Sequence, residues 1–208
     1  LGEYNALSSF AGVIPLETVL ELVFHRGSTM HHLIPRDEKG RSNYRMGALR
    51  PNQFGVGDDG VREYVESVSK ASGEFLQIVN YNLAGQQYAV AGTIAGLKAL
   101  KADSARRVAE YGGKPAFMLV PGIDVPFHST LLRKGVPEFR DKLDALLPKH
   151  IDYRGRLVGR YIPNLVAVPF EMTKEFAAKI LEVVPSERIK AALDDPKVWD
   201  SYADDDQK

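Results

Sequence analysis

One stretch and two single side chains of this 208-residue sequence could do chemistry together. Leu1-Gly2-Glu3 matches the second half of a Gly-x-Ser-x-Gly turn, in which a strand turns sharply into a helix and exposes a serine hydroxyl. His128 is a candidate general base because the unperturbed pKa of histidine lies near neutrality. Arg26 carries a planar cation that can pair with an anionic substrate group. These residues predict nucleophilic catalysis by a serine that would lie just before Leu1.

The N-terminal motif has two interpretations. Gly2 fits the second glycine of the turn, and the apolar and aromatic spacing of residues 3–10 predicts a helix packed beneath it. A short motif matches by chance, so an ordinary helix start is the alternative. Ser8 and Ser9 are no substitutes for the missing nucleophile, because they fall inside that helix, where a hydroxyl usually bonds to the backbone.

Arg26 lies on a predicted amphipathic helix that runs from Pro15 to about Ile34 and ends at Pro35. Its apolar positions recur at steps of three and four residues, which describes one buried stripe: Leu16, Val19, Leu20, Val23, Gly27 and Met30. Arg26 is at the edge of this stripe, where a guanidinium is costly unless it meets an anion. The alternative is an arginine whose charged end simply reaches solvent from the edge of the stripe.

His128 is predicted to lie at the end of a loop. Pro121 and Pro126 bracket an extended segment before it, so the histidine is not expected on a regular helix face. A purely structural histidine is the alternative to a general base. Three other histidines, His25, His31 and His32, share a helix without the i, i+4 pair of a zinc motif, so no metal site is predicted.

Composition excludes several classes of function. Lysine plus arginine (27) balances aspartate plus glutamate (27), and the charges are interspersed, so neither nucleic acid nor an anionic membrane is an expected partner. The absence of cysteine removes disulfides, thiolate nucleophiles and cysteine-bound metals, and suits a reducing compartment. No apolar run approaches the ~20 residues of a transmembrane helix. We therefore expect a soluble, cytoplasmic protein.

The segment after the first helices must position these groups, and its pattern predicts alternating strands and helices. After a polar stretch at 36–43, we expect a strand at 44–49, a helix capped by Asp58 or Asp59 and ending near Ala71, and strands at 74–79 and 88–91. A helix begun by Thr93 then ends near Gly112, before a last strand at 116–120. The order β-α-β-β-α-β is that of a ferredoxin-like subdomain. Helical segments on both sides of it in the sequence indicate an insertion into a larger α/β domain.

A family resemblance rests on several blocks that follow one another in register along most of the chain: Leu1–Tyr4, Phe24–Met30, Pro35–Tyr44, Ile78–Asn82, Gln86–Tyr88, Val125–Thr130 and Gly159–Leu165. In these blocks the chain resembles the malonyl/palmitoyl transferase domain of type I fatty acid synthases of the fungal and actinobacterial kind. More distantly, it resembles the malonyl-CoA:acyl carrier protein transacylases of bacteria. The resemblance implies a hydrolase-like α/β acyltransferase core formed by 1–43 and 123–208, with 44–122 as the ferredoxin-like subdomain.

The resemblance also implies roles for the candidate residues. The serine before Leu1 would attack the thioester of acyl-CoA, and His128 would take its proton and return it to the leaving thiol. The backbone amide of Leu1 would be one oxyanion donor. Arg26 would bind the free carboxylate of malonate with both arms of its guanidinium. The acyl group would then pass to the phosphopantetheine thiol of an acyl carrier protein.

Other implied features concern the pocket and the partners. Met30, Asn80, Asn82 and Gln86 would line or support the pocket, with helix packing and turn hydrogen bonds as the alternative for each. No metal or redox cofactor is required. The expected partners are malonyl-CoA, palmitoyl-CoA, the acyl carrier protein and the other domains of a synthase.

Three hypotheses follow from the sequence. The first is an acyltransferase whose nucleophile comes from a preceding segment, so that the 208 residues alone are predicted to be inactive. The second is a non-catalytic docking or assembly fragment of the synthase. The third is another α/β serine hydrolase, which would have no need for Arg26.

Overall fold

The computed structural model describes residues 2–12, 14–148 and 152–203. They form two compact units, which we call the helical unit (Leu1–Phe24 with Asp141–Lys208) and the sheet unit (His25–Arg140). Two helices, α2 (Leu16–Leu33) and α5 (Val136–Leu146), each contribute residues to both units. The predicted limits of the α/β core and of its insertion, 1–43 with 123–208 and 44–122, stay a prediction.

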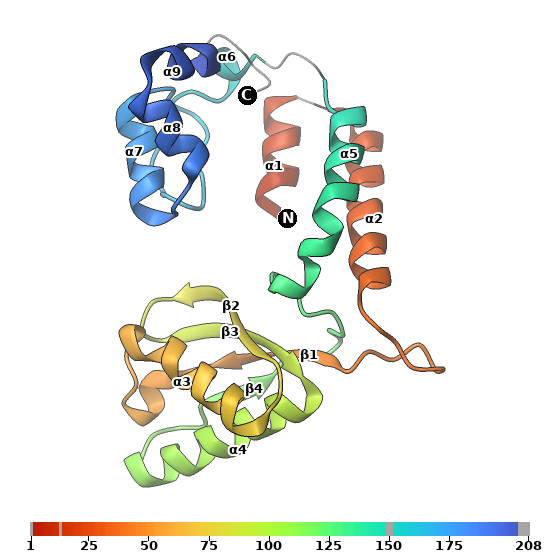
Figure 1. Cartoon of the computed structure of the whole chain (residues 1–208), viewed down its shortest axis with the longest axis vertical. Helices are drawn as coiled ribbons and strands as arrows, with labels where there is room; N and C mark the ends of the chain where they lie inside the picture. Colours follow the sequence, from red (N-terminus) through yellow and green to blue (C-terminus); the bar gives the residue numbers. More distant parts are fainter. Residues whose placement is uncertain (1, 13, 149–151, 204–208) are drawn as a thin grey trace. The chain divides into compact units, whose positions relative to one another are not determined.

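The sheet unit contains the predicted β-α-β-β-α-β series. Its elements are β1 (Tyr44–Leu49), α3 (Asp58–Ser72), β2 (Leu76–Leu83), β3 (Gln87–Thr93), α4 (Ile94–Tyr111) and β4 (Phe117–Leu119). The strands form one sheet in the order β2-β3-β1-β4, and every neighbouring pair is antiparallel. Helices α3 and α4 cover one face of this sheet (Figure 1). Short 3₁₀ helices, η1 (Pro51–Phe54) and η2 (Thr130–Gly135), follow β1 and β4.

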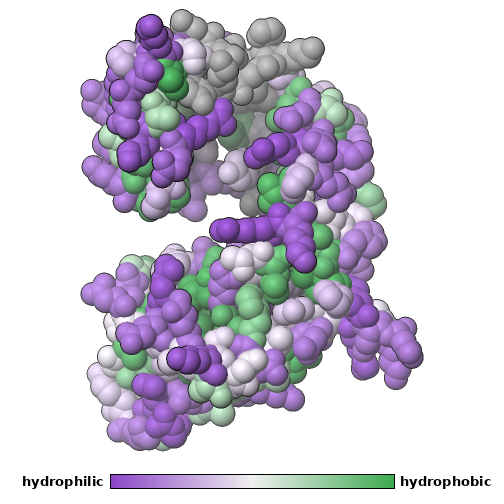
Figure 2. Space-filling model, in the orientation of Figure 1, coloured by the Kyte–Doolittle hydropathy of each residue, from purple (hydrophilic) through white to green (hydrophobic). Residues whose placement is uncertain are grey.

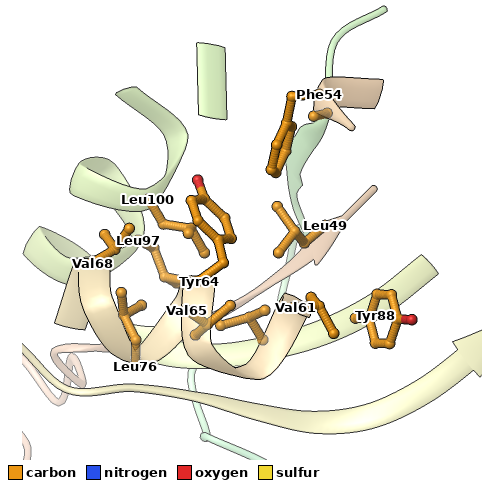
Figure 3. Close-up of a cluster of buried hydrophobic side chains, with 12 residues drawn as sticks. Leu49, Phe54, Val61, Tyr64, Val65, Val68, Leu76, Tyr88, Leu97 and Leu100 are labelled. Atoms are coloured by element: carbon orange, nitrogen blue, oxygen red, sulfur yellow. The ribbon is translucent and has the colours of Figure 1, made fainter. Parts of the chain in front are cut away.

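The core of this unit lies between the sheet and its two helices. Buried residues of α3 recur at steps of three and four, as an amphipathic helix requires, and meet apolar side chains of α4, β1, β2 and β3 (Figure 3). The cluster includes Leu49, Phe54, Val61, Tyr64, Val65, Leu76, Tyr88, Leu97 and Leu100. The outer surface over α3 and α4 is mostly hydrophilic or neutral (Figure 2). The sheet and both helices therefore share one apolar layer.

Replacing Leu100 by alanine tests this core. Leu100 is 0 % exposed in α4, so Leu100→Ala should lower the free energy of unfolding by about 3 kcal/mol, from lost burial and the cavity left behind. Urea denaturation followed by circular dichroism measures the change. Lys98→Ala, on an exposed position of the same helix, is the control and should change stability by less than about 0.5 kcal/mol. Equal midpoints for the two variants would contradict the described core.

The ends of α3 and α4 are fixed differently. Thr93 caps α4 as predicted, because its hydroxyl accepts a hydrogen bond from the Gly96 amide at 3.1 Å. The prediction that Asp58 or Asp59 caps α3 was wrong. Gly57 is the cap residue, and the Asp58 carboxylate instead accepts hydrogen bonds from the Tyr88 hydroxyl and the Gly85 amide. The hydroxyl of buried Tyr88 thus binds this carboxylate and joins the start of α3 to β3.

The helical unit consists of α1 (Gly2–Ala11), the first half of α2, the end of α5, and the helices α6 (Tyr153–Arg156), α7 (Lys174–Val183), α8 (Glu187–Asp194) and α9 (Pro196–Ala203). In α1, the Glu3 carboxylate accepts a hydrogen bond from the Tyr161 hydroxyl at 2.5 Å and one from the Asn164 amide at 2.9 Å. These bonds lower the pKa of Glu3. They fix the first turn of α1 against the segment after α6. Among the described residues, no helix combines the length and apolar character needed to span a membrane.

Candidate functional site

The backbone of His128, the candidate general base, is strained. It lies in the loop between β4 and η2, as predicted, and its φ of 61° is in the left-handed region that side chains other than glycine rarely adopt. Such conformations persist only where the surroundings impose them, and they cluster at functional sites. The role of His128 as a general base stays a prediction, and the structure shows that its backbone is held in an unfavourable conformation.

Hydrogen bonds on both sides of His128 hold this loop. Before it, Val125 and Pro126 are buried, and the carbonyl of Pro126 accepts the Ser129 amide at 3.2 Å. After it, the amide and the hydroxyl of Thr130 both donate to the side-chain oxygen of Gln77, at 3.0 and 3.1 Å. Gln77 lies on β2, and no sequence motif pointed to it. The loop is thus attached to the sheet immediately after the histidine.

Close packing brings the second half of α2 to η2. At Gly135, the last residue of η2, an added Cβ would lie 2.5 Å from Leu33 and 2.8 Å from Thr29, so only glycine fits against these α2 side chains without a shift. The Thr29 hydroxyl also donates to the Glu138 carboxylate at 3.1 Å. Arg26 lies one turn before Thr29 on the same helix.

Arg26 acts on His128 electrostatically. Desolvation lowers the pKa of His128, and the positive charge of Arg26 lowers it further. His128 is nevertheless an exposed residue. At neutral pH it is therefore predominantly uncharged, the form that can accept a proton from a nucleophile.

Arg26 has no counter-ion among the described residues. It is half-buried, yet no described aspartate or glutamate pairs with it, whereas Arg36, Arg106 and Arg107 all have carboxylate partners. A partly desolvated guanidinium without an anion is a ready site for one. The charge and fork of Arg26 therefore suit a carboxylate ligand beside the imidazole.

An ion pair joins the two chain segments that lead into and out of the sheet. Arg36 follows α2, Asp124 follows β4, and their side chains make two hydrogen bonds, of 2.5 and 3.2 Å. The Arg36 side chain is only 13 % exposed. Its guanidinium lowers the pKa of Asp124, so the pair stays charged through the neutral range. Asp124 lies four residues before His128, so the pair fixes the start of the loop that carries the histidine.

Comparisons with known proteins place the chain in a family. No protein-family model matches it. It is 36 % identical to the fatty acid synthase β subunit of Saccharomyces cerevisiae and 32 % to that of Schizosaccharomyces pombe, in each case over 97 % of this chain and 12 % of the relative. The chain belongs to the acyltransferase family of fatty acid synthases. It spans about an eighth of the length of these relatives.

Solved structures agree with the family. The acyl-carrier-protein S-malonyltransferase of Burkholderia pseudomallei is 30 % identical, with a TM-score of 0.54, over 71 % of this chain and 42 % of that protein. FabD of Acinetobacter baumannii shares the fold, with 24 % identity and a TM-score of 0.57 over 96 % of this chain and 55 % of that protein. The predicted α/β class is therefore confirmed for this acyltransferase chain.

The remaining predicted site residues of the acyltransferase chain are spread over the sheet unit. Met30 is half-buried one turn beyond Arg26 on α2. Asn80 and Asn82 are exposed at the far end of β2 and bond to each other, at 2.5 Å between Nδ2 and Oδ1. Gln86 is exposed in the turn between β2 and β3. Among the described residues, no hydrogen bond links these four side chains to Arg26 or His128, so their place in a pocket stays a prediction.

Two further predictions concern the nucleophile and metals. Leu1, the predicted oxyanion donor, lies outside the described residues. In the part of the chain that the structure describes, no three histidine, aspartate or glutamate side chains are grouped so that they could hold a metal ion.

Proposed function

We propose that this acyltransferase domain, in the complete protein, transfers malonyl groups between CoA and the phosphopantetheine thiol of an acyl carrier protein. The observation that carries the proposal is the unpaired guanidinium of Arg26, which is close enough to His128 to lower the pKa of its imidazole. Malonate offers one free carboxylate for Arg26 while its thioester reacts near His128. The printed name of the Burkholderia relative, an S-malonyltransferase, supports this choice of acyl group.

The proposed reaction has two matching halves. A serine next to Leu1 attacks the thioester carbonyl, its proton passes to the Nε2 or Nδ1 atom of His128, and the thiolate of CoA leaves with that proton. The backbone amide of Leu1 would stabilise the oxyanion. In the second half, His128 deprotonates the carrier thiol, which attacks the acyl-serine and releases the serine hydroxyl. The acyl carrier protein and the other domains of a synthase are the proposed partners.

The finer features of the fold belong to the same proposal. We infer that 44–122 form a ferredoxin-like subdomain inserted into a hydrolase-like core of 1–43 and 123–208. Two observations support it: the order of elements is β-α-β-β-α-β, and the sheet order is β2-β3-β1-β4. Met30, Asn80, Asn82 and Gln86 are proposed to line the acyl pocket that this subdomain helps to close. Palmitoyl is proposed as a second acyl group, bound without the help of Arg26.

Mass spectrometry of the complete domain after incubation with malonyl-CoA tests the function. We expect an adduct of one malonyl group on the serine next to Leu1, and its loss when carrier protein bearing phosphopantetheine is added. The 208 residues without that serine should form no adduct. A complete domain that binds carrier protein but never forms the adduct would favour the docking fragment. Rapid release of free malonate in place of transfer to the thiol would favour a hydrolase.

A further inference from the structure

We propose that Gln77 is a positioning residue for the transfer reaction, acting through the loop that carries His128. This inference rests on the proposed function, in which His128 is the general base. Gln77 does not contact the reacting atoms. Its side-chain oxygen accepts both donors of Thr130, two residues after the histidine, at 3.0 and 3.1 Å.

The register of the sheet directs Gln77 towards this loop. Its neighbours Leu76 and Ile78 belong to the core beneath α3 and α4, and side chains alternate along a strand, so Gln77 points to the opposite face. On that face Gln77 is paired with Ala91, and Ala91 with Met46, in one row across three strands. Ala91 and Met46 are both buried. The amide of Gln77 thus stands at the end of a buried row, on a rigid element.

The loop offers no other cap for the helix that follows His128. Thr130 is the first residue of η2, so its amide has no acceptor within that helix. Ser129, the cap residue, makes no side-chain capping bond, and its buried hydroxyl has no hydrogen-bond partner among the described residues. The oxygen of Gln77 supplies the missing acceptor. One side chain from β2 therefore fixes the start of η2.

This anchor matters because the conformation of His128 needs support on both sides. A φ of 61° is unfavourable for histidine, and the loop would relax to a negative φ if it were free to do so. Pro126, fully buried, fixes the chain before the histidine, and the bonds between Gln77 and Thr130 fix it afterwards. Relaxation on the second side would turn the imidazole away from the nucleophile while leaving the fold and the binding of substrate intact.

Variants at both ends of this contact test the inference in the complete domain. Gln77→Ala should lower kcat for malonyl transfer roughly 10- to 100-fold with KM nearly unchanged, since a misplacement of about 1 Å can cost that much. Gln77→Glu keeps the acceptor oxygen and should restore kcat to within about threefold of the wild type. Thr130→Val removes only the hydrogen bond from the hydroxyl and should lower kcat by less. It replaces Gln77→Ala as the test if that variant fails to fold. Gln53→Ala is the matched control, because Gln53 likewise accepts a backbone amide, that of Lys114, at 3.0 Å.

A double-mutant cycle with His128→Asn separates positioning from general damage. If Gln77 acts through His128, Gln77→Ala should cause no further loss in the His128→Asn background. An equal loss in both backgrounds, or a loss matched by Gln53→Ala, would overturn the inference while leaving the role of His128 intact. Full activity of His128→Asn itself would instead overturn the proposed function, and with it any action of Gln77 through that residue.

Discussion

Replacing His128 by asparagine should lower the rate of malonyl transfer by the complete domain about 10²- to 10⁴-fold, the usual contribution of a general base. Asparagine is the informative substitution here. It tolerates the left-handed backbone that His128 adopts at φ 61°, so the variant loses the base without the added strain of alanine. The loss should be in kcat, and acyl-CoA binding should change little.

Single-turnover formation of the acyl-enzyme, followed by mass spectrometry, measures this effect directly. His32→Asn provides the control, because His32 lies exposed on α2 of the same unit, bonded to Ser28. It should react at the wild-type rate. Rapid acylation of His128→Asn would show that another group takes the proton.

Arg26→Ala should reduce kcat/KM for malonyl-CoA by about 10²- to 10⁴-fold and leave transfer of palmitoyl almost unchanged. Each hydrogen bond between charged groups contributes roughly 1.5–3 kcal/mol, and a carboxylate held by both arms of the guanidinium makes two. Palmitate has no second carboxylate to lose. Parallel assays with malonyl-CoA and palmitoyl-CoA measure the ratio. Equal losses for both would contradict the proposed carboxylate contact.

The same variant should change the pH dependence of the reaction. Arg26 lowers the pKa of His128, so removing its charge should raise that pKa. The acid limb of the profile of kcat/KM against pH then moves to higher pH, because less of the imidazole is neutral at any given acidity. Arg26→Lys keeps the charge and should keep the limb in place, although lysine lacks the fork and should still lose preference for malonyl.

Periodicity predicted most of the elements, and the discrepancies have a local cause. The strand predicted at 44–49 is β1 without change. The strand predicted at 74–79 instead runs from Leu76 to Leu83. Asparagine is depleted in strands, so Asn80 and Asn82 led to the prediction that the strand ends at residue 79. Pairing with β3 carries the strand onward through two irregularities, between Ile78 and Asn80 and between Tyr81 and Leu83.

The candidate site was predictable where a residue type is unusual for its surroundings. A histidine just after a segment bracketed by two prolines and an arginine at the edge of an apolar stripe both stand out, and in the structure the charge of Arg26 lowers the pKa of His128. Gln77 gave no such signal. Its proposed role depends on its hydrogen bonds with Thr130, which lies 53 residues further along the chain. A neutral polar residue in a strand does not reveal a partner at that distance.

The ion pair between Arg36 and Asp124 also bears on the entropy cost of closing the chain into a loop. It closes a loop that spans 88 positions of the chain, with Arg26 just outside one end and His128 just outside the other. The entropy cost of closing a loop grows only with the logarithm of its length. The sheet inside the loop could therefore change in length at little entropic cost, provided that the hydrogen bonds from Thr130 to Gln77 on β2 are kept. Under the proposed function, the enclosed module is therefore the part of the chain in which a change of accepted acyl group would arise, while the Arg36–Asp124 pair keeps the ends of the loop together.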